Sequence, residues 1–288
     1  MIDAGKMGVW YGADKLNPSE WKRFISAVET LGYSTLWYSE SRGFESMSFG
    51  SYLLSISSKI KIGSSIASIY ARDAAASRNG MRTLNAISDD RYILGLGVSH
   101  APMVEGMRGH TYGKPLSTMR DYLQMMRKDE TGADDWPLVI AALGPKMLEL
   151  SSELTQGAVP YNVTPNHTAR ASAILGPNKL LAVEQKVCLE TNPTKARELA
   201  RNELSRYMPM VNYRNCWLAD GFSEADLADG GSNRFLDAMV VWGGQQAIEK
   251  RIQEHYDAGA THVCIQPVAP AGDLEAAILV LETMAPTG

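Results

Sequence analysis

The chain has 288 residues, of which 45% are hydrophobic and 21% are charged, and 13 are prolines. These proportions are typical of a globular protein and exclude a disordered, fibrous or membrane-embedded chain. The formal charge is -4, and Lys and Arg are spread thinly along the sequence. Without a basic stripe to neutralise phosphates, no nucleic-acid partner is expected, and a small-molecule substrate is the expected partner.

Cysteine usage and apolar runs predict where the protein works. The cysteines Cys188, Cys216 and Cys264 are far apart and form no Cys-x-x-Cys motif, which is typical of a reducing compartment. The first residues lack the pattern of a signal peptide, and no run approaches the roughly 18 apolar residues of a membrane span. We therefore expect a cytoplasmic protein with no membrane partner.

Strand-like and helix-like segments alternate in the first half of the chain, according to their apolar periodicity. Asn17 is a typical helix cap, with Pro18 at the first helical position. In chain order we expect strand 6–10, helix 18–31, strand 35–39, helix 47–57, strand 59–65, helix 74–87 and strand 92–96.

The second half repeats this alternation. We expect helix 115–128, strand 137–142, helix 145–154, strand 157–163, helix 165–175, strand 179–189, helix 194–207, helix 245–258, strand 261–266 and helix 273–284. Eight strand–helix units in a chain of this size predict an α/β fold, a closed (β/α)₈ barrel of the TIM type. No linker marks a boundary, so a single domain over residues 1–288 is expected.

Residues 208–233 break the alternation. The segment contains Tyr213, Cys216, Trp217 and Phe222, and it is too long and too aromatic for a plain connection. We interpret it as an insertion near the C-terminal end of the barrel, serving as a lid or a subunit contact. The alternative is a solvated loop with its own small cluster.

Several nucleotide, hydrolase and metal motifs are absent. The stretch from Gly95 to His100 lacks the third glycine of a dinucleotide fingerprint, and the following segment opens with Pro102, Gly106 and Gly109 rather than with a helix. No phosphate-binding Walker loop or nucleophile elbow occurs. The five histidines show no paired spacing for zinc, so no metal is expected. The histidines at 255 and 262 are expected to be structural.

The most informative stretch runs from Arg91 to His100, an apolar strand that becomes glycine-rich and ends on a histidine. Gly95 and Gly97 remove side chains where a ligand or another backbone segment can approach. In parallel α/β proteins the carboxyl end of such a strand carries the chemistry.

Two further strand ends carry candidate functional groups. Glu40 follows strand 35–39, where it can exchange a proton or contact a cofactor ring, or simply pair with Arg42. Gly144 and Pro145 open helix 145–154, whose N-terminal N–H groups can bind a phosphate with Lys146 as counter-charge. A plain helix start explains that pattern equally well.

These segments resemble the bacterial luciferase-like family, particularly its coenzyme F420-dependent oxidoreductases from actinobacteria. The similar segments lie in the family's order at residues 32–40, 62–73, 91–102, 141–147 and 257–264. The resemblance implies a barrel that binds F420, or alternatively FMN, across its C-terminal mouth, and a homodimer. It also implies a cis peptide bond between Ser65 and Ile66 that supports the ring. The ring edge, tail and phosphate would be held by Gly97, Val98, Ser99, Ala142, Leu143, Gly144, Pro145 and Lys146.

The chain departs from the family pattern at three positions. Ser41 stands where some F420-dependent relatives have a histidine, which argues against their sugar-phosphate dehydrogenase chemistry. His100 stands where they have a glutamate. Val98 replaces the arginine that holds the FMN phosphate in luciferase itself, which favours F420.

The leading hypothesis is hydride transfer between C5 of F420 and a small organic substrate. His100 is the candidate proton donor or acceptor, since imidazole titrates at about pH 6.5, and Glu40 would orient the ring or a proton relay. The alternatives are an FMN-dependent monooxygenase fed with reduced flavin, and a flavin- or deazaflavin-binding protein without turnover. A Schiff-base lyase using Lys186 is disfavoured.

Overall fold

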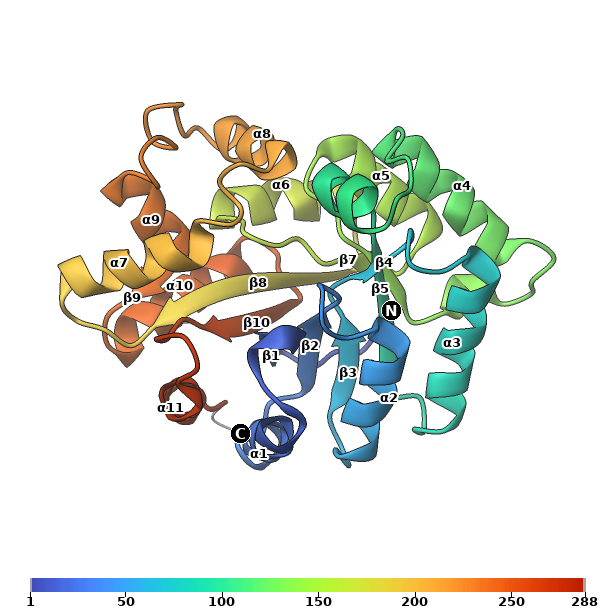
Figure 1. Cartoon of the computed structure of the whole chain (residues 1–288), viewed down its shortest axis with the longest axis horizontal. Coiled ribbons are helices and arrows are strands. Elements are labelled where there is room, and N and C mark those ends of the chain that lie inside the picture. Colours follow the sequence, from blue (N-terminus) through green and yellow to red (C-terminus); the bar gives the residue numbers. More distant parts are fainter. Residues whose placement is uncertain (1, 287–288) are drawn as a thin grey trace.

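The structure, a computed structural model, describes residues 2–286. Strands and helices alternate along the chain (Figure 1). The strands are β1 (Met7–Gly12), β2 (Thr35–Ser39), β3 (Lys61–Ser64), β4 (Ala67–Ser68), β5 (Tyr92–Gly97), β6 (Leu138–Ile140), β7 (Gly157–Ala158), β8 (Leu180–Cys188), β9 (Val240–Trp242) and β10 (His262–Pro267). The α-helices are α1 (Pro18–Thr30), α2 (Ser46–Ser55), α3 (Ala74–Ala86), α4 (Pro115–Arg127), α5 (Pro145–Leu154), α6 (Pro165–Leu175), α7 (Pro193–Leu204), α8 (Val211–Ala219), α9 (Asn233–Met239), α10 (Gln245–Asp257) and α11 (Leu274–Thr283).

The sheet closes into the predicted eight-stranded parallel barrel. Its order is β1, β2, β3, β5, β6, β7, β8 and β10, and β10 pairs with β1 to complete the circle. The closing pair β8–β10 runs from His262 opposite Ala182 to Pro267 opposite Val187. All eight predicted strands are confirmed. The short strands β4 and β9, which pair with β5 and β8, were not predicted.

Local sequence signals explain how the helices begin. The Asn17 side chain accepts hydrogen bonds from Ser19 N and Glu20 N, and the Glu20 carboxylate accepts from Asn17 N, which completes a capping box before Pro18. Gly144 is the N-cap of α5, and Pro145 is its first residue. The expectation of no helix after Pro102 was wrong, because Pro102–Met107 forms a π-helical segment.

The barrel interior near the start of β10 is filled by large side chains and by His262, whose two ring nitrogens are both hydrogen-bonded. Trp37 Nε1 donates to His262 Nε2 at 3.1 Å, and His262 Nδ1 donates to Gly5 O at 2.9 Å. Between barrel and helices, His255 Nε2 donates to Gln185 Oε1 at 3.0 Å. Both histidines are fully buried, so their predicted structural role is confirmed.

The predicted insertion at 208–233 is a packed segment that is partly helical. It contains α8 and reaches the first residue of α9. Trp217 is fully buried and donates from Nε1 to Asn162 O at 3.0 Å. The Trp217 ring stacks with Tyr213 at 5.8 Å and meets Phe235 edge-on at 4.8 Å. The aromatic residues therefore anchor the segment to the barrel.

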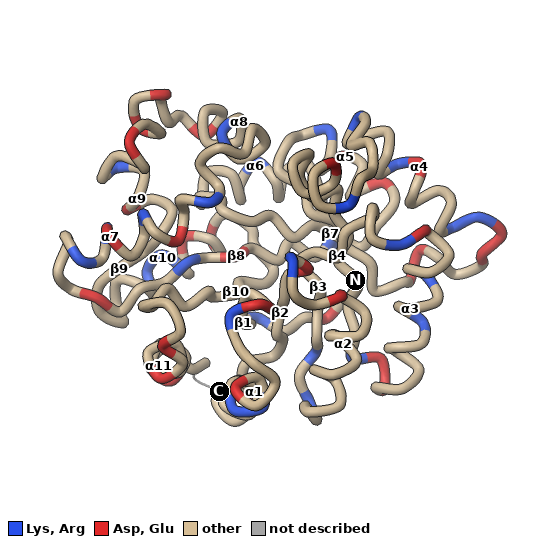
Figure 2. Tube along the Cα trace, in the orientation of Figure 1, with Lys and Arg blue, Asp and Glu red and all other residues tan. Residues whose placement is uncertain are grey.

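Charges of both signs alternate along the chain in Figure 2, without a long basic stripe. Within residues 2–286, no helix combines the length and apolarity needed to cross a membrane. All three cysteines are free and buried.

Candidate active site at the barrel mouth

The segment between β3 and β4 is fastened to the carboxyl end of β2. Ser65 N donates to Tyr38 O at 2.6 Å, and Glu40 N donates to Ile66 O at 3.2 Å. The peptide bond between Ser65 and Ile66 is cis, as the resemblance implies. We call Ser65–Ser68 the mouth segment, because it borders the ends of β2, β3 and β5 where parallel strands carry functional groups.

The glycines of β5 make room for this neighbouring segment. A Cβ atom on Gly95 would lie 2.0 Å from the Ser64 carbonyl oxygen, and one on Gly97 would lie 2.4 Å from Ile66 Cγ1. The sequence left open whether a ligand or another backbone segment lies beside these glycines. In the structure, β3 lies beside Gly95 and the mouth segment lies beside Gly97.

His100 lies just beyond β5, against the insertion. Its ring is 5.6 Å from the ring of Tyr213. Burial lowers the pKa of His100 below 6.5, and a hydrogen bond with the Asn212 side chain partly opposes that shift. The preceding residue, Ser99, has a left-handed backbone (φ 55), and its carbonyl accepts from Tyr112 Oη at 3.0 Å.

Glu40 is held in a different network from His100. Its side chain is only 3% exposed and pairs with Arg72, not with Arg42. Arg72 Nη2 is 2.5 Å from Glu40 Oε1, and Nη1 is 3.2 Å from Oε2. The Ser68 backbone N–H donates to Oε2 at 2.7 Å. The carboxylate is thus fully engaged with protein donors.

The α5 N-terminus is open to solvent, as an anion site requires. Gly144, Pro145 and Lys146 are exposed, and no side chain caps the helix. No atom lies within 4 Å of a Cβ built on Gly144. The preceding Leu143 carbonyl accepts a hydrogen bond from His167 Nε2 at 2.8 Å, a contact that sequence reasoning missed.

A buried polar group near the barrel mouth surrounds Lys186, which the sequence offered only as a disfavoured Schiff-base lysine; its partners were missed. Lys186, 1% exposed, donates to Asn162 Oδ1 at 2.6 Å and to both Glu184 oxygens at 3.2 Å. Its ammonium lies 3.9 Å from the centre of the Tyr161 ring. Burial lowers the pKa of Lys186 and raises that of Glu184, while their mutual attraction opposes both shifts.

This polar group continues towards the outside of the barrel. Tyr161 Oη donates to Gln266 Oε1 at 2.8 Å, and Gln266 Nε2 donates to Glu203 Oε1 at 2.8 Å. Glu203 also pairs with Lys15 at 3.2 Å. Beside the Tyr161 ring, at 4.8 Å, lies the ring of Trp10. Among the described residues, Trp10 Nε1 is buried without a hydrogen-bond partner.

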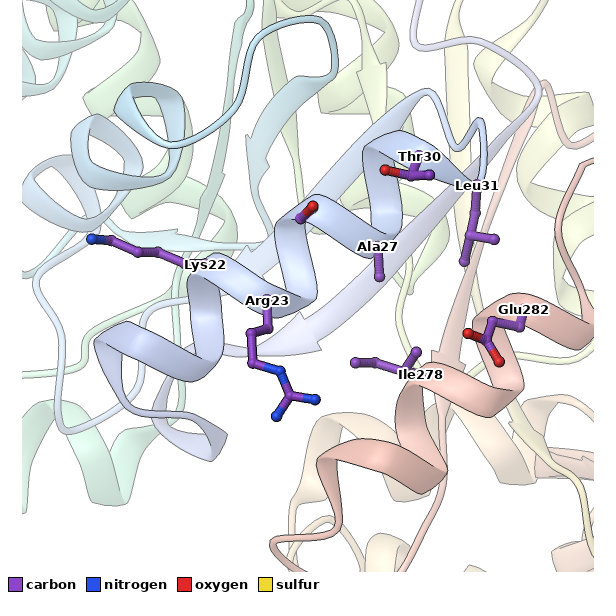
Figure 3. A pocket seen from close by; sticks show the side chains of 8 residues that line it. Lys22, Arg23, Ala27, Thr30, Leu31, Ile278 and Glu282 are labelled. Carbon is purple, nitrogen blue, oxygen red and sulfur yellow. The ribbon is translucent and has the colours of Figure 1, made fainter.

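Two outer cavities lie away from the mouth. One, of about 500 Å³, lies between α1 and α11 and is lined by Lys22, Arg23, Ser26, Ala27, Thr30, Leu31, Ile278 and Glu282 (Figure 3). The other, of about 590 Å³, is lined by residues of α6, α9 and α10 and of the loop after α8. Neither is lined by a predicted site residue. Within residues 2–286, no group of three or more His, Cys, Asp or Glu side chains is arranged to hold a metal ion.

Sequence comparisons give a consistent set of relatives. A Mycobacterium tuberculosis protein provisionally named a coenzyme F420-dependent oxidoreductase is 26% identical over 194 residues, covering 56% of this chain and 55% of that protein. The 5,10-methylenetetrahydromethanopterin reductase of Methanolobus tindarius is 26% identical over 157 residues, covering 47% of this chain and 48% of that protein. The chain thus spans about half the length of both relatives.

Two solved structures share the fold over nearly the whole chain. An F420-dependent secondary alcohol dehydrogenase in complex with an F420-acetone adduct superposes with a TM-score of 0.77, at 15% identity, covering 96% of this chain and 97% of that one. A Pseudomonas putida Baeyer-Villiger monooxygenase in complex with FMN gives a TM-score of 0.72 at 14% identity, covering 98% of this chain and 97% of that one. Residues 2–135, somewhat less than half of the chain, match the family described as luciferase-like monooxygenase, and this part of the chain is similar to that family.

Proposed function

We propose that the chain is an oxidoreductase that transfers a hydride between coenzyme F420 and a small organic substrate at the barrel mouth. The observation that carries this proposal is the mouth segment, which is hydrogen-bonded to β2 and packs Ile66 against Gly97. The names of one sequence relative and of one structural neighbour, which give F420 as their coenzyme, support the choice of cofactor. Residues 1–288 as a single domain and a homodimer stay predictions.

The mouth residues fit a planar ring that is rich in acceptors and carries an anionic tail. The buried Trp10 Nε1 lacks an acceptor, which a ring oxygen or nitrogen would supply. The uncapped N-terminus of α5 is suited to a phosphate. In this proposal the ring is held by Ser65, Ile66, Gly97, Val98 and Ser99, and the tail by Ala142, Leu143, Gly144, Pro145 and Lys146. F420 bound there supplies C5 as the hydride donor or acceptor.

His100 is the proposed acid–base residue. Burial keeps its imidazole neutral at pH 7, so its free nitrogen can accept the hydroxyl proton of an alcohol as the carbon loses a hydride. The reverse reaction returns that proton to a carbonyl oxygen. The Tyr213 ring lies beside the imidazole at 5.6 Å. Glu40, in contrast, orients the mouth segment rather than exchanging protons.

An FMN-dependent monooxygenase is the second candidate, because the fold also matches an enzyme in complex with FMN. Parallel titrations of the purified protein with F420 and with FMN, followed by fluorescence and absorbance, separate the two. We expect saturable F420 binding at micromolar concentration and at least tenfold weaker FMN binding. Preferential FMN binding, together with oxygen consumption that depends on reduced FMN, would refute the F420 proposal.

A further inference from the structure

We propose that Arg72 is a positioning residue for the mouth segment and acts through Glu40. This inference rests on the proposed function, since the position of the segment affects catalysis only if it supports a cofactor ring. Arg72 follows β4, 32 residues after Glu40 in the sequence, and its side chain is 9% exposed.

The Glu40 carboxylate needs a fixed positive partner, because an unpaired buried charge is strongly destabilising. The Arg72 guanidinium meets both of its oxygens, at 2.5 and 3.2 Å. This two-point contact fixes the plane of the carboxylate as well as its charge. A lysine would supply the charge without the paired donors.

The oriented carboxylate in turn contacts the mouth segment directly. Glu40 Oε2 accepts from Ser68 N at 2.7 Å, and the Glu40 backbone N–H donates to Ile66 O at 3.2 Å. Arg72 Nη1 also donates to Ser68 O at 3.4 Å. The side chains of Glu40 and Arg72 therefore hold the segment at Ser68, and the Glu40 backbone holds it at Ile66. The Ile66 side chain packs against Gly97.

A second carboxylate on Arg72 offers a matched control. Glu45 Oε1 is 2.5 Å from Arg72 Nη2, but the Glu45 side chain is 50% exposed, in contrast to 3% for Glu40. Glu45 caps α2 by accepting from Met47 N and Ser48 N, and it does not hydrogen-bond to the mouth segment. Removing its charge leaves the Glu40–Arg72 contact in place.

The test combines F420 affinity with amide hydrogen exchange in four variants. Arg72→Met should weaken F420 binding tenfold or more and speed exchange of the Ser68 amide, because Glu40 loses its orientation. Arg72→Lys should recover part of both losses. Glu40→Gln combined with Arg72→Met should bind F420 more tightly than Arg72→Met alone, since it removes a buried charge whose remaining charged partner, Arg108, is 4.0 Å away. Glu45→Gln should stay within twofold of wild type.

A folded Arg72→Met protein with F420 affinity within twofold of wild type would overturn the inference. The inference also fails if Glu45→Gln loses as much F420 affinity as Arg72→Met. If Arg72→Met does not fold, Arg72→Lys decides: wild-type affinity and unchanged Ser68 exchange overturn it. A wild-type protein that binds neither F420 nor FMN refutes the proposed function. Ser68 exchange in Arg72→Lys then still decides whether Arg72 positions the segment.

Discussion

The two glycines of β5 should respond very differently to a single added methyl group. A Cβ on Gly95 would lie 2.0 Å from the Ser64 carbonyl oxygen, which belongs to the backbone of β3 and cannot rotate away. One on Gly97 would lie 2.4 Å from Cγ1 and 2.6 Å from Cδ1 of Ile66, which can change rotamer. Gly95→Ala must therefore push two strands apart, whereas Gly97→Ala displaces one side chain.

Overpacking a close-packed interior typically costs about 1–3 kcal/mol, and a clash with backbone belongs at the upper end. We expect Gly95→Ala to lower the unfolding free energy by about 3 kcal/mol and Gly97→Ala by about 1 kcal/mol. Gly97→Ala should also weaken F420 binding, because Ile66 belongs to the mouth segment.

Urea denaturation and F420 titration measure the two effects separately. Gly106→Ala is the matched control, because no atom lies within 4 Å of its added Cβ; alanine there should be neutral or stabilising by up to about 1 kcal/mol. The reasoning fails if Gly95→Ala is within 0.5 kcal/mol of wild type, roughly the spread of surface substitutions. It also fails if Gly97→Ala loses more stability than Gly95→Ala.

Two further predictions concern histidines. His100→Ala should leave F420 affinity within twofold of wild type but reduce turnover by about 10²–10⁴-fold with any substrate found by screening; unchanged turnover contradicts the role assigned to His100. In NMR titrations of the wild-type protein, the His100 imidazole should titrate below pH 6.5. Burial holds the pKa of His262 at about 4 and that of His255 at about 3. The folded protein therefore keeps both imidazoles neutral, whereas the unfolded chain takes up protons below pH 6.5. Each histidine should lower the unfolding free energy by up to about 1.4 kcal/mol per pH unit as the pH falls from 6.5 towards 4. Urea denaturation at several pH values measures this slope, and a flat profile down to pH 4.5 would contradict it.

The fold was predictable because each barrel strand carries its own apolar signal. The run from Tyr92 to Leu96 is apolar throughout, and the structure has a strand at Tyr92–Gly97. The strands β4 and β9 contain two and three residues, too few for any periodicity to be read. The helical segment after Pro102 was missed because proline and glycine were interpreted as breakers, whereas proline is well tolerated in the first helical turn.

The candidate site was only partly predictable. Glu40 was found because it follows a strand, but its partner Arg72 depends on how two mouth loops meet, for which the sequence holds no local signal. The buried pair at 184 and 186 did leave a signal. Two charges spaced by two residues in a largely apolar strand point to the same face, and in a barrel strand that face can be the interior.

The barrel interior itself changes character from one end to the other. At the start of β10, His262 has both ring nitrogens paired, and the surroundings are neutral. Towards its end, Gln266 lies opposite Lys186 in register, and here the interior holds a buried ion pair and a Tyr161 ring flanked by the unpartnered Trp10 N–H. A buried ion pair adds little net stability compared with apolar side chains of similar volume, and an orphaned donor adds none. Fold stability thus explains the interior around His262, at the start of the strands, but not the interior around Lys186 and Trp10. The second region is the one that faces the mouth, where the parallel strands end.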